Sequence, residues 1–236
     1  MNLLPRFLCP AALAFVAFLA GTAAGQAPDD TRRPCTEDAM IVFDASGSMA
    51  GNTVQGLFSD ITRIDEVRKA LAQVLPHAAK FRKIGLITYG PGPYAQCNVQ
   101  LNFRPMPNAT EPIMSVVNAI NPAGKTPLVK AVELAAGVLD NQGVVVLVTD
   151  GEETCGGAPC ELGKSLKANN RLTVHVVGYQ LKAFRWTGAQ SFLDAKCLAE
   201  ETGGLYITAE NRQDLIEAFE KTLGCPMMSA VGAVSR

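Results

Sequence analysis

The sequence predicts an α/β fold, with a doubly wound, mostly parallel six-stranded sheet, one antiparallel edge strand and helices on both faces. Three observations lead to this prediction. Short apolar runs alternate along the chain with longer segments in which apolar residues recur at helical spacing. Two of the runs, at 39–43 and 143–148, are apolar on both faces, as central parallel strands are. Two other runs are joined by a short turn, which predicts a hairpin.

The first half of the chain contains three predicted strands. The run AMIVF is followed by a helix over 63–75, in which apolar residues recur about one turn apart. The strand KIGLITY then leads through a turn rich in glycine and proline into NVQLNF, which alternates like a half-exposed strand. These two strands form the hairpin, with the outer strand at the sheet edge. A further helix is expected near 111–120.

The second half continues the alternation. Thr126, Pro127 and Leu128 are expected to open a helix, because threonine is a favoured cap and proline a favoured first residue. The remaining elements are, in order, a strand GVVVLVTD, a helix over 159–168, a strand LTVHVVGY, a helix over 190–202 that ends at Gly203, a strand LYIT and a helix over 212–223.

Composition restricts the classes of partner. The 236 residues are 48% hydrophobic, enough for one substantial core. Charged residues make up 18% and the formal net charge is -1, which gives no electrostatic basis for binding nucleic acid or an anionic membrane. Aromatic residues are only 6%, so a platform for stacking bases is not expected either.

The N-terminus has the layout of a secretory signal peptide over residues 1–25, with one early arginine, a short apolar core and small residues at the cleavage region. The apolar core is too short for a comfortable membrane span, although an uncleaved anchor stays open. A polar leader over 26–36 follows, then a single domain over 37–225 and a C-terminal tail over 226–236. The expected location is therefore periplasmic or secreted.

Removal of the signal peptide leaves six cysteines. An even number in an exported chain predicts three disulfides. The six residues are Cys35, Cys97, Cys155, Cys160, Cys197 and Cys225.

Two buried strands end in aspartate, the first at Asp44 and the second at Asp150. In doubly wound sheets, ligands collect beyond the carboxyl ends of strands where the strand order reverses. Two bare carboxylates held close there would repel each other and raise one pKa, and a divalent cation removes this repulsion. Ser46 and Ser48 follow Asp44 at alternate positions and add hydroxyl oxygens.

The set Asp44-Ala-Ser46-Gly-Ser48, then Thr126, then Asp150 resembles the metal-ion-dependent adhesion site (MIDAS) of von Willebrand factor type A domains. The resemblance covers about 37–223, and the segment DGEETCGGAPC looks like bacterial secreted members of this family. It implies the Rossmann-like fold of the family, with Mg²⁺ as cofactor and Ca²⁺ or Mn²⁺ as substitutes.

The resemblance also implies a function. The five side chains would hold the cation with an incomplete shell, and an acidic residue of a partner protein would complete it. An exported protein-binding module, and not an enzyme, is therefore expected, with its oligomeric state open. Glu152, Arg185 and Trp186 are candidate partner contacts near the metal.

The strand order of the family, 3-2-1-4-5-6, also implies a disulfide pattern. With that order, Cys35 and Cys225 both lie at the end of the sheet opposite the metal. A Cys97–Cys197 bridge would join opposite edges, which the Cα spacing of a disulfide, about 6 Å, does not allow. The expected pairs are Cys35–Cys225, Cys97–Cys155 and Cys160–Cys197.

Other interpretations stay open for the same residues. The serines could instead be turn residues after a strand, and Thr126 could be a helix cap. A nucleophilic serine needs a base, and His77 and His175 are both expected away from the strand ends. A metal-dependent hydrolase would have Glu152 as its only candidate base. A structural envelope domain with a vestigial metal site is a third possibility.

Overall fold

The computed structural model describes residues 37–53, 60–92, 97–168, 171–181 and 190–224 of the chain. Their order alternates strands and helices as the sequence predicts. The elements are β1 (Ala39–Asp44), the short 3-10 helix η1 (Gly47–Ala50), α1 (Arg63–Ala78), β2 (Ile84–Tyr89), β3 (Val99–Met106), α2 (Thr110–Ala119), α3 (Leu128–Val138), β4 (Gly143–Thr149), α4 (Pro159–Lys167), β5 (Leu172–Tyr179), α5 (Gln190–Glu201), β6 (Tyr206–Ala209) and α6 (Arg212–Thr222).

The six strands form one sheet in the order β3-β2-β1-β4-β5-β6. β1 pairs in parallel with both β2 and β4, and β5 and β6 continue the parallel part. β3 pairs antiparallel with β2 and forms one edge. The predicted fold class is therefore confirmed, including the antiparallel edge strand. The strand order reverses at β1, the first strand of the chain and a central strand of the sheet.

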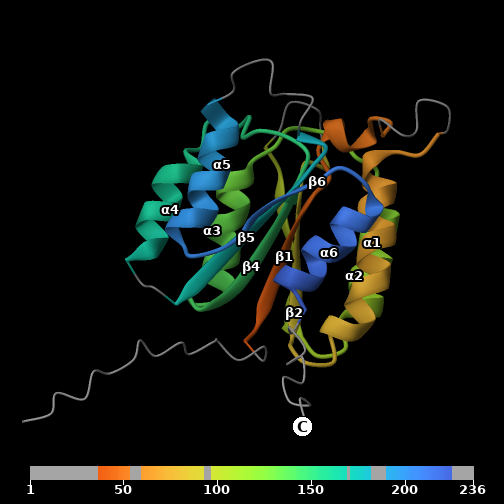
Figure 1. The fold of residues 1–236 in the computed structure, drawn as a ribbon, viewed down its shortest axis with the longest axis horizontal. Coiled ribbons are helices and arrows are strands. Elements are labelled where there is room, and N and C mark those ends of the chain that lie inside the picture. The colour runs from red at the N-terminus through yellow and green to blue at the C-terminus, as the bar shows by residue number, and fades with distance from the viewer. Residues whose placement is uncertain (1–36, 54–59, 93–96, 169–170, 182–189, 225–236) are drawn as a thin grey trace, which may run out of the picture. The chain divides into compact units, whose positions relative to one another are not determined.

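Helices cover both faces of the sheet, with α1, α2 and α6 on one face and α3, α4 and α5 on the other (Figure 1). The strand β1 shows why both faces are apolar. Successive side chains of a strand point to opposite faces. Ile41 and Phe43 thus pack in the core beneath α1 and α6, whereas Met40 and Val42 pack in the core beneath α3. All four side chains are fully buried.

The start of α3 differs from the sequence prediction. The helix begins at Leu128, and Pro127 occupies the capping position with φ -82° and ψ 60° and no side-chain cap bond. Thr126 is therefore not the helix cap. The first turn is capped by a residue from a distant loop, because the Glu153 carboxylate accepts a hydrogen bond from the Val129 N–H at 2.8 Å.

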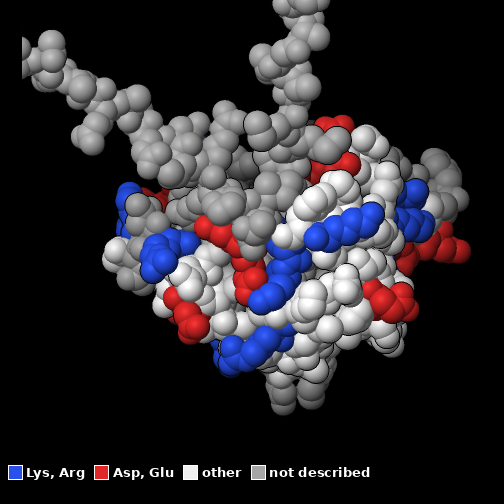
Figure 2. Space-filling model, turned by 90° about the horizontal axis from the view of Figure 1, so that it is seen from below, with Lys and Arg blue, Asp and Glu red and all other residues white. Residues whose placement is uncertain are grey.

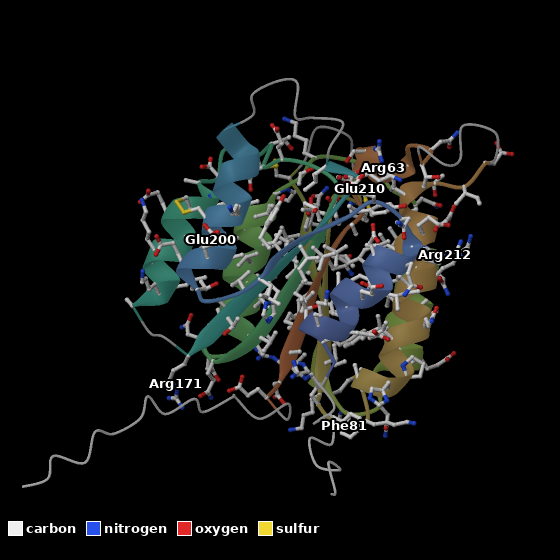
Figure 3. All side chains as sticks on the ribbon, viewed as in Figure 1. Arg63, Phe81, Arg171, Glu200, Glu210 and Arg212 are labelled. Carbon is white, nitrogen blue, oxygen red and sulfur yellow. A yellow bond between two sulfur atoms is a disulfide. The ribbon has the colours of Figure 1, made fainter. Side chains whose placement is uncertain are left out.

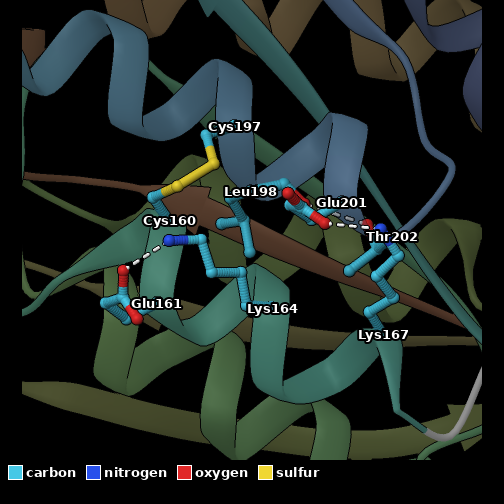
Figure 4. Close-up of a disulfide and its surroundings, with 8 residues drawn as sticks. All are labelled: Cys160, Glu161, Lys164, Lys167, Cys197, Leu198, Glu201 and Thr202. Carbon is cyan, nitrogen blue, oxygen red and sulfur yellow. Dashed lines mark hydrogen bonds and ion pairs between the residues drawn. A yellow bond between two sulfur atoms is a disulfide. The ribbon is translucent and has the colours of Figure 1, made fainter.

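Two disulfides lie within the described residues, and both are pairs that the sequence analysis expects. Cys97–Cys155 ties the chain before β3 to the loop after β4, with Cα atoms 6.0 Å apart. Cys160–Cys197 joins α4 to α5 (Figure 4) with Cα atoms 5.0 Å apart. The expected pair Cys35–Cys225 lies outside the described residues.

Several other expectations also fall outside the described residues, namely the signal peptide over 1–25, the leader over 26–36, the tail over 226–236, and the contact candidates Arg185 and Trp186. Within the described ranges, none of the helices combines the length and the apolar character needed to cross a bilayer. On the face seen in Figure 2, basic and acidic side chains are interspersed, without a broad surface of one sign.

Candidate metal centre

The two aspartates predicted to meet do so at the carboxyl ends of the central strands. β1 and β4 are neighbours, and their parallel register pairs Phe43 with Val148. The next residues along each strand, Asp44 and Thr149, therefore lie at the same edge of the sheet, and Asp150 follows immediately. Both carboxylates are buried, with 0% of Asp44 and 1% of Asp150 exposed.

Hydrogen bonds connect four of the five predicted ligands. The Asp44 carboxylate accepts from the Ser46 N–H at 2.8 Å and from the Thr149 hydroxyl at 2.8 Å. The hydroxyl oxygens of Ser46 and Ser48 lie 3.0 Å apart, and the Ser48 hydroxyl donates to Asp150 Oδ1 at 2.6 Å. The turn after β1, which forms η1, thus brings both serines between the two carboxylates.

Thr126, the fifth predicted ligand, lies on a loop bonded to the serine turn. Ala123 N–H donates to Ala45 O at 2.9 Å, and Gly47 N–H donates to Gly124 O at 3.2 Å. These bonds on either side of Ser46 hold the two loops together. Thr126 itself is 5% exposed. The structure therefore brings its loop to the edge where the other four residues meet.

The segment after Asp150 holds Thr126 in place. The N–H of Thr126 donates to the Thr154 hydroxyl at 2.8 Å, and the N–H of Thr154 donates to the carbonyl of Thr126 at 3.0 Å. Both bonds involve backbone atoms of Thr126, and its hydroxyl takes part in neither of them. Glu153 accepts from Cys155 N–H at 2.7 Å as well as from the first turn of α3. Glu153 and Thr154 are therefore positioning residues, and the disulfide at Cys155 tethers the same segment.

Sequence reasoning missed three residues at this site. Thr149 bonds Asp44, and its position as a hydroxyl residue next to Asp150 was the available signal. Arg63 donates to Asp150 Oδ2 at 3.1 Å, although the two residues are 87 positions apart in the sequence, and no local sequence pattern predicts this contact. The buried hydroxyl of Tyr89 lies beside Asp44 without a hydrogen bond of regular geometry.

The environment raises the pKa of both aspartates. For Asp44, burial is the largest cause, and it outweighs the hydrogen bonds from Ser46 and Thr149, which lower the pKa. Burial and then the negative charge of Asp44 raise the pKa of Asp150 to about 6, against the lowering effects of Ser48 and Arg63. Burial and the charge of Asp44 also raise the pKa of the Tyr89 hydroxyl. Without a cation, negative charge is disfavoured here.

The free energy of unfolding of the cation-free protein is expected to fall as the pH rises from about 4 to about 6. The pKa of Asp150 is about 6 in the folded protein against a usual 3.8, so the folded state binds the proton more tightly in this window. The full shift corresponds to about 3 kcal/mol. Urea denaturation in EDTA across this pH range measures the effect.

The variant Asp150→Asn isolates the contribution of this carboxylate. Acidic groups away from the site, such as Glu66, whose pKa is lowered mainly by the hydrogen bond from Arg212, titrate alike in both proteins. The stability of the variant relative to wild type should therefore rise between pH 4 and 6. Parallel stability curves for the two proteins would contradict the expectation.

The gathered side chains suit a hard divalent cation. Carboxylate and hydroxyl oxygens are the ligands that Mg²⁺ and Ca²⁺ take. A dication would offset the burial that raises both aspartate pKa values and the repulsion by Asp44 that raises the pKa of Asp150 further. Over the part of the chain that the structure describes, no group of three or more histidine, cysteine or acidic side chains forms a softer or more acidic metal site. Glu152, two positions beyond Asp150, is half-buried.

Neither histidine is placed to serve as a base at this site. His77 lies in the last turn of α1 and stacks edge-on against Phe81, at the opposite end of the sheet (Figure 3). His175 lies in the middle of β5, and its Nδ1 accepts from the Leu205 N–H at 2.9 Å. The predicted separation of the histidines from the serines is therefore confirmed.

Comparison with known proteins places the chain among relatives of similar length. The family model for the von Willebrand factor type A domain matches residues 39–153. The uncharacterized protein YwmD of Bacillus subtilis (strain 168) is 31% identical over 198 residues, which cover 77% of this chain and 82% of YwmD. The uncharacterized protein YwmC of the same strain is 28% identical over 203 residues, covering 80% of this chain and 84% of YwmC.

Solved structures share the fold at lower identity. An aerotolerance-related membrane protein from Bacteroides fragilis NCTC 9343 aligns with a TM-score of 0.58 at 20% identity, covering 79% of this chain and 98% of that one. Proximal thread matrix protein 1 from the mussel byssus, with a zinc occupied MIDAS motif, aligns with a TM-score of 0.56 at 16% identity, covering 81% and 46%. By the match of the family model over residues 39–153, with which the fold agrees, the chain belongs to the von Willebrand factor type A domain family.

Proposed function

We propose that this protein is an exported, cation-dependent protein-binding module and not an enzyme. Asp44, Ser46, Ser48, Thr126 and Asp150 form a complete MIDAS that holds Mg²⁺, and an acidic residue of a partner protein completes the shell. The observation that carries the proposal is the pair of buried carboxylates joined through Ser46 and Ser48 at the switch point of the sheet: Asp44 accepts from the Ser46 N–H, the two serine hydroxyls lie within hydrogen-bond distance, and the Ser48 hydroxyl donates to Asp150.

Each part of the chain has a defined task in this proposal. Asp44 and Asp150 supply the negative charge, and the serine and threonine hydroxyls supply neutral oxygens, so the charge of a dication is only just balanced. When bound, the cation supplies a Lewis-acidic position that an anionic side chain from outside can fill. Thr149 and Thr154 orient the ligands through the bonds described above.

Three further observations support an exported, cation-binding module. The two disulfides are consistent with an extracytoplasmic location, because such bonds persist in oxidising compartments. Both histidines lie away from the serines, which leaves the hydroxyls without a nearby imidazole base. The mussel relative with zinc in its MIDAS motif supports cation binding by the same fold.

Capture of partners from an extract of the source envelope, with and without EDTA, tests the proposal. Proteins retained by the immobilised chain in Mg²⁺ should be released by EDTA and recaptured after Mg²⁺ is restored. Chemical amidation of carboxylates in the extract should abolish capture, since the proposed contact is a partner carboxylate. Retention that is unaffected by EDTA would refute the proposed mechanism.

A further inference from the structure

Arg63 is a fixed part of the candidate metal centre. It is the first residue of α1 and lies at the upper end of the sheet in Figure 3. Its Nη1 donates to Asp150 Oδ2 at 3.1 Å and to the carbonyl of Ser48 at 3.0 Å, and only 19% of its side chain is exposed. Both of these partners belong to the predicted ligand set, so the guanidinium contacts the centre directly.

The position of Arg63 at the start of α1 explains why it needs a carboxylate partner. The N-terminus of a helix carries a partial positive charge, so a cation at the first helical residue is unfavourable unless a carboxylate offsets it. The acidic residues in the first turn of α1 pair elsewhere. Asp65 pairs with Arg68 at 3.0 Å, and Glu66 pairs with Arg212 at 2.7 Å. The carboxylate that offsets Arg63 is therefore Asp150.

A charge count shows what this contact does. The carboxylates of Asp44 and Asp150 contribute two negative charges, and Arg63 contributes one positive charge. A bound dication then leaves the loaded centre with an excess of one positive charge, whereas without Arg63 the same centre would be neutral. The excess charge sits in a largely buried site, where screening by water and salt is weak.

We infer that Arg63 is a specificity-determining residue, which weakens cation binding and makes the loaded centre select a carboxylate over a neutral ligand. This inference rests on the proposed function and adds a residue outside the five ligands. A loaded centre with excess positive charge attracts an anion more strongly than a neutral centre does. The same charge repels the dication, so the two effects of Arg63 have opposite signs for the two ligands.

Measurement of Mn²⁺ affinity tests the first effect. At pH 8, Arg63→Gln should bind Mn²⁺ about tenfold more tightly than wild type, as followed by the electron paramagnetic resonance of free Mn²⁺. Arg63→Lys keeps the charge and should stay close to wild type. Arg212→Gln is the matched control, because it removes an arginine from a different buried carboxylate, Glu66.

Titration of acetate into the Mn²⁺-loaded protein tests the second effect. Acetate serves as the carboxylate probe, and loss of Mn²⁺-bound water, seen in proton relaxation, reports its binding. The acetate dissociation constant should rise about tenfold in Arg63→Gln and stay near wild type in Arg63→Lys. The inference requires both shifts in Arg63→Gln.

The outcomes separate this inference from the proposed function. Wild-type protein that binds no Mn²⁺ would remove the proposed function, and the inference with it. Wild-type protein that binds Mn²⁺, with unchanged or weaker Mn²⁺ affinity in Arg63→Gln, would overturn the inference alone, because Arg63 would then act by positioning Ser48. Unchanged acetate affinity in the same variant would also overturn it.

Discussion

Replacement of Asp44 by asparagine is expected to abolish the stabilisation of this protein by Mg²⁺ or Mn²⁺. The asparagine oxygen can still accept from Ser46, but the centre loses one of its two negative charges. At a cation concentration about 100 times Kd, binding to the native state adds about 2.7 kcal/mol to the free energy of unfolding. For a domain of this size, Tm rises by roughly 5–10 °C, and the variant should show none of this rise.

Thermal unfolding with cation or EDTA measures the effect. The matched control is Asp38→Asn. Asp38 directly precedes the first residue of β1, at the end of the strand away from the site. Its response to cation should equal that of wild type. In EDTA, Asp44→Asn should be folded and at least as stable as wild type, since the buried charge that the fold disfavours has been removed. A cation-induced rise in Tm that survives in Asp44→Asn would exclude Asp44 as a ligand.

The second large effect is expected for Gly124→Ala, on the loop that carries Thr126. Gly124 has a φ of 79°, and a Cβ added there would lie 1.9 Å from the carbonyl oxygen of Gly90. Gly90, with a φ of 98°, is in turn packed against the backbone of Ser46 at the site. Neither backbone can shift without moving the serine turn. The left-handed conformation and the overlap together predict a loss of about 3 kcal/mol in the free energy of unfolding.

Gly137→Ala gives a control with the opposite sign. Gly137 lies within α3, and a Cβ added there meets nothing within 4 Å. Alanine in a helix interior is favoured over glycine by about 0.5–1 kcal/mol, so this variant should be more stable than wild type. Urea denaturation of both variants measures the two shifts. Equal stability of Gly124→Ala and wild type would show that the two loops are not locked together.

The start of α3 is a place where the local sequence pattern predicted the wrong helix cap. Thr126 and Pro127 form a favourable cap and first residue by their own propensities, but the helix begins at Leu128. The capping bond comes instead from Glu153, 24 positions later than the N–H that it accepts from. The free N–H groups of a first helical turn can be satisfied by any acceptor that the fold brings near, so a local pattern does not identify the acceptor of the bond. The exchange also frees the Thr126 hydroxyl from a capping role.

The disulfides show a case in which topology carried the prediction. Spacing in the sequence alone leaves many pairings of six cysteines open. The strand order of the family separates the two edges of the sheet, and the structure joins Cys97 to Cys155 and Cys160 to Cys197 accordingly. A pairing between distant segments therefore needs a three-dimensional arrangement, even when the residues and their compartment are evident.

The sequence by itself predicted the sheet, which the structure confirms, and the residues proposed to form the site. Short runs that are apolar on both faces fit buried central strands, and each of the two that end in aspartate brings a carboxylate to one edge of the sheet. The tertiary structure alone decided what surrounds those carboxylates. Arg63 donates to Asp150, 87 positions later in the sequence, and the N–H of Thr126 donates to the hydroxyl of Thr154, 28 positions later. Such contacts depend on where separate elements pack, and neither periodicity nor spacing along the chain records that.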